Sequence, residues 1–118
     1  MNSEDLKKRT KLMSLSVLAL ASSVRSSRES DVIVRQLIRS ATSVAANYRA
    51  ACKARSRADF INKIGIVEEE ADETALWLEY LIDLHLAEPA ATENALREVR
   101  ELVAIFAASA KTAKRNKS

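Results

Sequence analysis

The stretch that decides the fold spans residues 57–86 and reads RADFINKIGIVEEEADETALWLEYLIDLHL. It contains no proline, and its apolar residues recur at steps of three, four and seven, which places them along one face of an α-helix. The members of this stripe are Phe60, Ile64, Val67, Ala71, Leu78 and Leu81. Ser56, with Asp59 three positions later, has the spacing of a helix start. At 1.5 Å per residue, the predicted helix is about 45 Å long.

Three further segments show the same periodicity and predict three more helices. A serine at or near Ser30 is the expected N-cap of the second helix, and Pro89 fits the first turn of the last one. The predicted bounds are about 5–24, 30–54, 57–86 and 89–114. Four helices with short connections predict an all-α protein, an antiparallel up-down-up-down four-helix bundle that forms a single domain over residues 1–118.

The composition supports this fold class and bears on the compartment. The 118 residues include one glycine, one proline and 4% aromatic residues, which leaves little material for turns or sheet surfaces. No apolar run approaches the roughly 20 residues that span a bilayer. Glu4 and Asp5 precede the N-terminal basic cluster, unlike a secretory signal. The one cysteine, Cys52, cannot form an internal disulfide, so we expect a cytoplasmic protein with no membrane segment.

Charge is sorted along the chain in blocks. Residues 25–63 carry nine basic and three acidic side chains, whereas residues 64–101 carry eleven acidic and two basic ones. Residues 102–118 are basic again, with four basic side chains and no acid. The net charge of +3 conceals this arrangement. Such sorting can serve packing between copies, or it can offer a basic surface to a polyanion.

Residues 75–84, ALWLEYLIDL, are apolar almost all around the predicted helix. A helix of a monomeric bundle needs one buried face, so the surplus predicts a contact between subunits of a homo-oligomer. Aromatic residues are enriched in such contacts. The alternative is a wide core that one subunit fills with its large tryptophan. The predicted interface residues are Trp77, Tyr80, Leu81 and Leu84.

Basic residues recur along one stripe of the second predicted helix, and more follow in the C-terminal tail. At a spacing of about one turn, such side chains can track the phosphates of RNA or DNA. No aromatic residue lies between them, so a base-stacking platform is not indicated. The alternatives are a solvated face or salt bridges to the acidic third helix. The candidate nucleic-acid-binding residues are Arg35, Arg39, Arg49, Lys53, Lys111, Lys114 and Arg115, and Lys117 completes the tail.

A stripe of small polar residues lies beside the basic stripe. Small side chains let a second helix approach closely and form hydrogen bonds, so the stripe favours helix packing over catalysis. Its members are Gln36, Ser40, Ser43 and Asn47.

The side chains that could hold a metal or perform catalysis do not combine into a site. Carboxylates crowd residues 68–73, but consecutive positions point around a helix. The only histidine, His85, lacks the acidic residue three positions earlier that a di-iron bundle requires. Cys52 has no candidate base except the distant His85. Gly65 stands alone, so we expect it to mark a close approach of two backbones. The sequence predicts no enzyme, no metal site and no cofactor.

The stretch RQLIRSATSVAANYRAA at residues 35–51 resembles a family of four-helix bundles encoded in intervening sequences of bacterial 23S ribosomal RNA genes. The resemblance continues in ARSRADFINKI at 54–64, EADETALWL at 70–78 and ASAKTAKRN at 108–116. It therefore covers most of residues 30–116, in order. Arg49 and Ala50 depart from the family's usual "Tyr, any, Glu" pattern, and the loss of that acid makes the second helix more positive.

The resemblance implies an up-down bundle that assembles as a ring-like homo-oligomer, a pentamer, and it implies no established activity. A related group of similar bundles serves as accessory proteins to the reverse transcriptases of diversity-generating retroelements. Those proteins use basic surface to engage nucleic acid and the polymerase. That link lies at the level of the fold alone.

Two functions of different classes remain open at this point. One is a non-enzymatic bundle whose homo-oligomer offers its basic surface to RNA or another nucleic acid, with avidity from repeated subunits. The other is a structural or adaptor protein for protein–protein contacts, in which the basic second helix pairs with the acidic third helix of a neighbouring subunit. Charge reversal at Arg39 would weaken RNA binding in the first case and break the oligomer in the second.

Overall fold

The computed structural model describes residues 1–116, which form four α-helices. These are α1 (Ser3–Ser22), α2 (Arg28–Cys52), α3 (Arg57–Asp83) and α4 (Pro89–Arg115). The described part of the chain contains no strand, so the predicted all-α class is confirmed. Each helix begins and ends within three residues of its predicted bounds.

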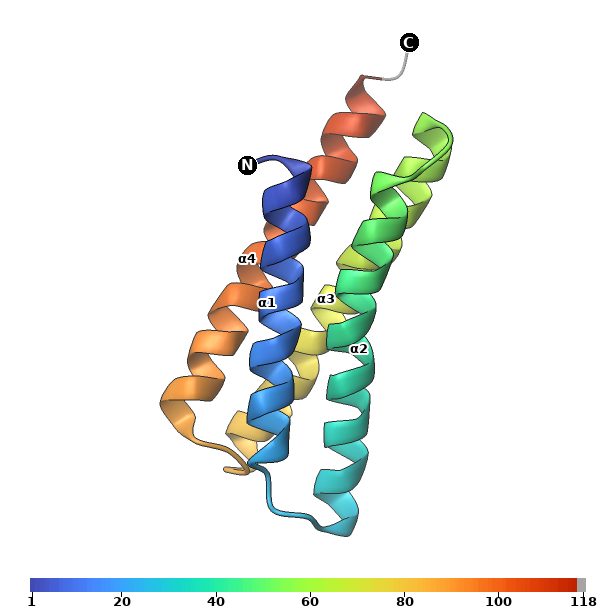
Figure 1. Cartoon of the computed structure of the whole chain (residues 1–118). Helices are drawn as coiled ribbons and strands as arrows, with labels where there is room; N and C mark the ends of the chain where they lie inside the picture. The colour runs from blue at the N-terminus through green and yellow to red at the C-terminus, as the bar shows by residue number, and fades with distance from the viewer. Residues whose placement is uncertain (117–118) are drawn as a thin grey trace.

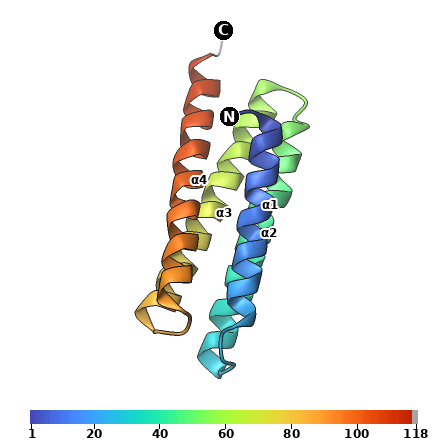
Figure 2. The ribbon, with the colours of Figure 1, turned by 60° about the vertical axis from the view of Figure 1, so that its left-hand side comes forward.

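The four helices lie side by side along one long axis (Figure 1). α1 and α3 begin at the end that holds both termini, and α2 and α4 run back toward it. α1 and α3 each contact α2 and α4 but not one another, so they occupy opposite corners of the bundle. The contact between α1 and α4 is the least extensive, and these two helices stand apart in Figure 2. The molecule measures 51 × 23 × 21 Å.

Local signals in the sequence account for the helix starts. Ser27 caps α2, and Ser56 caps α3 by accepting a hydrogen bond from the Asp59 N–H at 3.0 Å. The Asp59 carboxylate accepts the N–H of Arg55 at 3.1 Å, one residue before the cap. Pro89 occupies the first turn of α4, where its missing N–H costs no hydrogen bond.

The core runs the length of the bundle and draws on every helix. The largest fully buried side chains are Phe106, Leu37, Ile64, Leu78, Leu81 and Leu102. The rings of Tyr48 and Phe106 meet with their centroids 5.6 Å apart, which links α2 and α4 across the bundle. Burial raises the pKa of the Tyr48 hydroxyl above its ordinary value.

The middle of the stripe of small polar residues, Ser40 and Ser43, lies at the contact between α2 and α3. Ser40 and Thr74 are both fully buried there, and their hydroxyl oxygens are 3.0 Å apart. Thr74 also bonds the Glu70 carbonyl at 2.8 Å, and Asn47 donates to the Ser43 hydroxyl at 2.8 Å. Ser40 and Ser43 thus serve helix packing, as their small size predicted.

Gly65 does not mark a close backbone approach, and that prediction is wrong. A Cβ added at Gly65 would meet no atom within 4 Å. The residue lies inside α3, where glycine costs conformational entropy without any gain from its small size.

We therefore expect Gly65→Ala to raise the free energy of unfolding by about 0.5–1 kcal/mol, because alanine restricts the unfolded chain and favours the helix. Urea denaturation followed by circular dichroism at one protein concentration measures the change. Ala104→Gly, on the exposed face of α4, is the reverse control and should cost a similar amount. A loss of stability in Gly65→Ala would contradict the open surroundings of this position.

Candidate nucleic-acid interface

The turn between α2 and α3 gathers basic side chains around a hollow. Its lining residues are Ala50, Lys53, Arg55, Asp59 and Lys63. The Lys63 Nζ lies 2.6 Å from an Asp59 carboxylate oxygen, and this hydrogen bond lowers the pKa of Asp59 below its ordinary value. Within the described residues, Lys53 and Arg55 form no ion pair. Both side chains are therefore available to an anion.

The C-terminal turns of α4 reach the same end of the bundle (Figure 1). Lys111, Lys114 and Arg115 are exposed there, and Lys117 lies outside the described residues. Lys114 and Arg115 occupy the last turn of α4, where positive charge also stabilises the helix through its interaction with the helix dipole. Helix stability alone is thus one reason for basic residues at these positions.

The acidic side chains at this end are already engaged. Glu4 pairs with Lys7 at 3.0 Å, and the Asp5 carboxylate accepts the N–H of Asn2 at 3.2 Å. Asp59 is held by Lys63, as described above. The basic groups of the α2–α3 turn and of α4 consequently dominate the charge of this surface.

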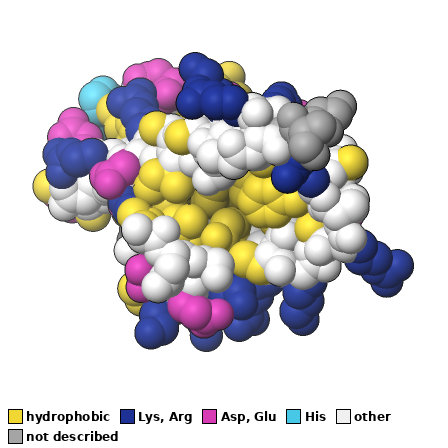
Figure 3. Space-filling view, turned by 90° about the horizontal axis from the view of Figure 1, so that it is seen from above, with side chains coloured by type: hydrophobic (Ala, Val, Ile, Leu, Met, Phe, Trp, Pro, Cys, Tyr) yellow, Lys and Arg dark blue, Asp and Glu magenta, His cyan; other side chains and the backbone are white. Residues whose placement is uncertain are grey.

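An apolar groove opens beside these basic residues. It lies between α3 and α4 and is lined by Phe60, Ile105, Ala108, Ser109, Thr112 and Ala113. Figure 3 looks onto this end of the molecule and shows hydrophobic side chains in a hollow with lysine and arginine at parts of the rim. The groove was not anticipated from the sequence, because it depends on how far α4 extends beyond its neighbours.

The seven predicted basic residues do not form one patch. All of them are exposed, but Arg35 and Lys53 are separated by about 27 Å along α2 at 1.5 Å per residue. Arg49 and Lys53 lie at the end that also holds the C-terminal turns of α4, whereas Arg35 lies toward the other end. Arg49 stands in the last turn of α2, where its positive charge also interacts favourably with the helix dipole.

Arg39 is bound to acids of its own subunit. Its guanidinium bonds the Glu70 carboxylate at 2.8 and 3.2 Å and also contacts Glu73. These hydrogen bonds raise the pKa of Arg39 above its ordinary value and lower the pKa of Glu70. Arg39 is therefore not among the unpaired basic residues that could bind nucleic acid. The pairing of the basic and acidic helices, expected between subunits in the adaptor hypothesis, occurs here within one subunit.

The prediction of Leu81 as an interface residue is wrong, whereas the other three predicted interface residues lie at or near the surface. Leu81 is 0% exposed because it faces the core beside Leu78. Tyr80 and Leu84 are 44% and 50% exposed. Trp77 is half-buried, and its indole N–H donates to Glu73 at 3.1 Å. Its ring centroid lies 5.3 Å from that of Tyr80.

Sequence reasoning missed an ion pair that joins the first and last helices. Arg9 of α1 bonds Glu98 of α4 at 2.7 Å through two nitrogens and contacts Glu101 at 2.8 Å. These hydrogen bonds raise the pKa of Arg9. No local pattern could identify partners that are 89 residues apart.

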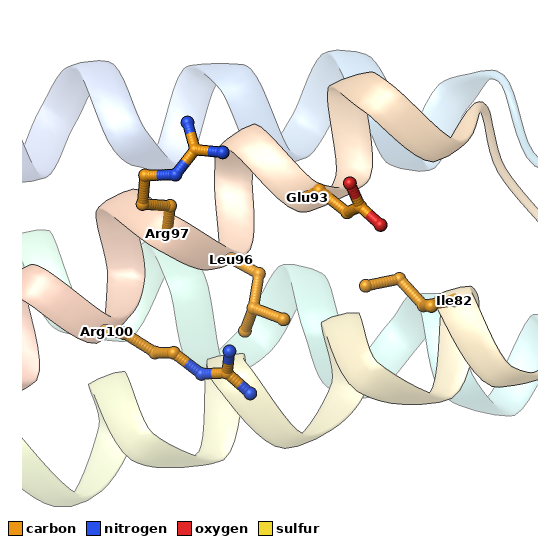
Figure 4. Close-up of a pocket in the computed structure, with 5 residues that line it drawn as sticks. All are labelled: Ile82, Glu93, Leu96, Arg97 and Arg100. Atoms are coloured by element: carbon orange, nitrogen blue, oxygen red, sulfur yellow. The ribbon is translucent and has the colours of Figure 1, made fainter.

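A second hollow lies between α3 and α4 near the opposite end of the bundle. It is lined by Ile82, Glu93, Leu96, Arg97 and Arg100. Arg97 and Arg100 extend in different directions on either side of Leu96 (Figure 4). Arg100 pairs with Glu79 at 3.1 Å. The lining contains no hydroxyl, thiol or imidazole group, so it offers no nucleophile with a base.

Residues 1–116 offer few side-chain groups that could hold a metal ion or act as a nucleophile with a base. No three histidine, cysteine, aspartate or glutamate side chains are grouped so that they could hold a metal ion. Cys52 ends α2 and His85 follows α3, which places the two residues at opposite ends of the bundle. No helix in this part of the chain has both the length and the apolar character needed to cross a bilayer.

Comparison with known proteins shows which protein family the chain belongs to. A search of curated proteins found no match. Among solved structures, the chain is similar to a protein of unknown function from the S23 ribosomal protein family of Bacteroides thetaiotaomicron. The two share 32% sequence identity with a TM-score of 0.84, over 94% of this chain and 99% of the other. Residues 4–108 match the family model of the 23S rRNA-intervening sequence proteins. The chain therefore belongs to the 23S rRNA-intervening sequence protein family.

Proposed function

We propose that this protein is a non-enzymatic RNA-binding protein, in which an antiparallel bundle assembles into a ring-like homo-oligomer and presents its basic end to RNA. The observation that carries the proposal is the gathering, from two separate parts of the chain, of basic side chains that form no ion pair within residues 1–116. These are Lys53 and Arg55 at the α2–α3 turn, and Lys111, Lys114 and Arg115 on α4. Such side chains bind phosphates without reading bases.

Two considerations support an RNA ligand. The family takes its name from intervening sequences of 23S rRNA, and the similar solved structure comes from an S23 ribosomal protein family. A ring would repeat a weak patch once per subunit, five times in the pentamer that the family resemblance implies. Repetition adds avidity without any new contact.

A second candidate function is an adaptor for another protein. The apolar groove of Phe60 and Ile105 favours it, because apolar surface beside charged residues is typical of protein-binding sites. In that case the basic residues around the groove would select an acidic partner, and RNA would bind weakly or not at all.

The test is a titration of structured RNA by the wild-type protein and by a triple variant, Lys53→Gln, Lys111→Gln and Lys114→Gln. If three phosphate contacts are lost, the slope of log affinity against log salt should fall by about two to three units. We expect affinity at moderate salt to fall about tenfold or more. Duplex DNA in a parallel titration shows whether the site prefers RNA.

A matched control carries the same change of charge at other positions, Arg25→Gln, Arg28→Gln and Arg97→Gln. These three residues are exposed, and they lie away from the basic end: two at the connection between α1 and α2, and one in the first half of α4. We expect the control to bind within about threefold of the wild type at moderate salt, because nonspecific attraction is screened beyond roughly 10 Å. Affinity that ignores salt, or equal losses in both triple variants, would overturn the proposal.

A further inference from the structure

The outer face of α1 carries leucines that the subunit itself leaves uncovered. Leu12 and Leu15 are 65% and 50% exposed, and exposed lysines lie on the turns before them. We call this surface the α1 face, formed by Lys8, Lys11, Leu12, Leu15 and Ala19. Within residues 1–116, neither lysine takes part in an ion pair. The face is therefore apolar with free positive charge.

The outer face of α3 has the opposite charge. Leu76, Tyr80 and Leu84 are 44%, 44% and 50% exposed, and acids lie on the turns before them. We call this surface the α3 face, formed by Glu69, Asp72, Leu76, Tyr80 and Leu84. Neither Glu69 nor Asp72 forms an ion pair in the described part of the chain. A shallow hollow bordered by Glu69, Asp72, Glu73, Leu76 and Glu79 opens beside it.

The two faces point away from opposite sides of one subunit. α1 and α3 occupy opposite corners of the bundle, and they run in the same direction along it. Two copies placed side by side in the same orientation therefore bring the α1 face of one toward the α3 face of the other. Contacts of this kind repeat from subunit to subunit, and they close into a ring when the rotation permits.

The helix positions set the level at which these faces meet. α1 begins at Ser3 and α3 at Arg57, both at the end that holds the termini. Arg39 of α2 binds Glu70 and Glu73 of α3, and α1 is joined to α2 by the short connection after Ser22, so the middle of α1 lies level with the middle of α3. Rotation without translation therefore brings the α1 face toward the part of α3 that carries Glu69, Asp72 and Leu76.

We infer that the α1 face of one subunit packs against the α3 face of the next copy, in a head-to-tail contact that builds the homo-oligomer of the proposed function. Pairing of like faces between copies that run in the same direction is disfavoured, because two α1 faces would then oppose lysines and two α3 faces would oppose acids.

The test uses two variants that each block one face. Leu12→Gln with Leu15→Gln alters the α1 face, and Leu76→Gln with Leu84→Gln alters the α3 face. Glutamine is uncharged and favours helices, and all four positions are exposed, so each subunit should fold, which circular dichroism checks. Light scattering after size-exclusion chromatography should give a multimer for the wild type. Each variant alone should run as a 13.0 kDa monomer.

Mixing supplies the decisive result. Each variant keeps one intact face, so an equimolar mixture should form one-to-one heterodimers and stop there. A contact between like faces predicts a different outcome, because one of the two variants would keep its own dimer. A variant that retains the wild-type mass, a mixture that stays monomeric, or a monomeric wild type would overturn the inference. RNA titration of the wild-type assembly is a separate readout, so a wild-type multimer that does not bind RNA would reject only the RNA-binding proposal.

Discussion

Phe106→Ala is expected to lower the free energy of unfolding by about 3–5 kcal/mol. The side chain is 0% exposed, and its ring centroid lies 5.6 Å from that of Tyr48. α2 and α4 occupy opposite corners, so this aromatic contact joins helices that have no direct backbone contact. Alanine would leave a cavity that the surrounding helices can fill only in part. Urea denaturation at a fixed protein concentration, followed by circular dichroism, measures the loss.

Ile105→Ala is the matched control for Phe106→Ala. Ile105 is the preceding residue of α4, but it is half-buried and lines the open groove at the basic end. We expect it to cost no more than about 1 kcal/mol, because water already reaches much of its side chain. Equal losses at the two positions would mean that the groove is filled in the assembled protein. A cost below about 1 kcal/mol for Phe106→Ala would contradict the central place of its ring in the core.

The helices were predictable because their signals are local. Apolar periodicity marks the faces, while Ser56 and Pro89 mark helix starts through hydrogen bonds to neighbouring residues. The end of α3 was less predictable. His85 adopts a left-handed conformation with φ of 55°, and the Leu86 N–H returns to the Leu81 carbonyl at 3.0 Å. Glycine is the usual residue for such a helix end, so the sequence carried no signal there.

The candidate site was less predictable than the fold, because its contacts join distant residues. Periodicity places Arg39 and Arg35 on one side of α2, yet only the packing of α3 decides which of them meets an acid. Leu81 illustrates the same limit, since a segment that is apolar on all sides does not reveal which side faces the core. Gly65 was misjudged because the sequence does not say what lies next to a helix. Identifying such neighbours requires the order of helices around the bundle.

Arg39→Glu should lower the free energy of unfolding by about 2 kcal/mol at neutral pH. The change removes charge-assisted hydrogen bonds to Glu70 and Glu73 and places a third carboxylate beside them. The Arg39 side chain is 47% exposed, so water screens the interaction and keeps the cost well below that of a buried pair. Arg39→Glu combined with Glu70→Arg should recover part of the loss, which urea denaturation can measure.

The pH dependence has a definite sign. Arg39 lowers the pKa of Glu70, so the folded state releases the Glu70 proton more readily than the unfolded state does. The stabilisation is therefore complete above the ordinary glutamate pKa of 4.5 and is lost as the pH falls through the lowered value. The wild type should thus lose its advantage over Arg39→Gln in acid and keep it unchanged between pH 6 and 8.

Arg35→Glu is the matched control for Arg39→Glu. Arg35 lies one turn before Arg39 and has no ion pair among the described residues. We expect it to change stability by no more than about 0.5 kcal/mol, as is usual for surface substitutions. If Arg39 serves its own subunit, Arg39→Glu lowers stability while light scattering still shows the wild-type oligomer under folding conditions. An oligomer that dissociates while the subunits stay folded would instead return Arg39 to the contact between subunits. That result would contradict the pairing of Arg39 with Glu70 within one chain.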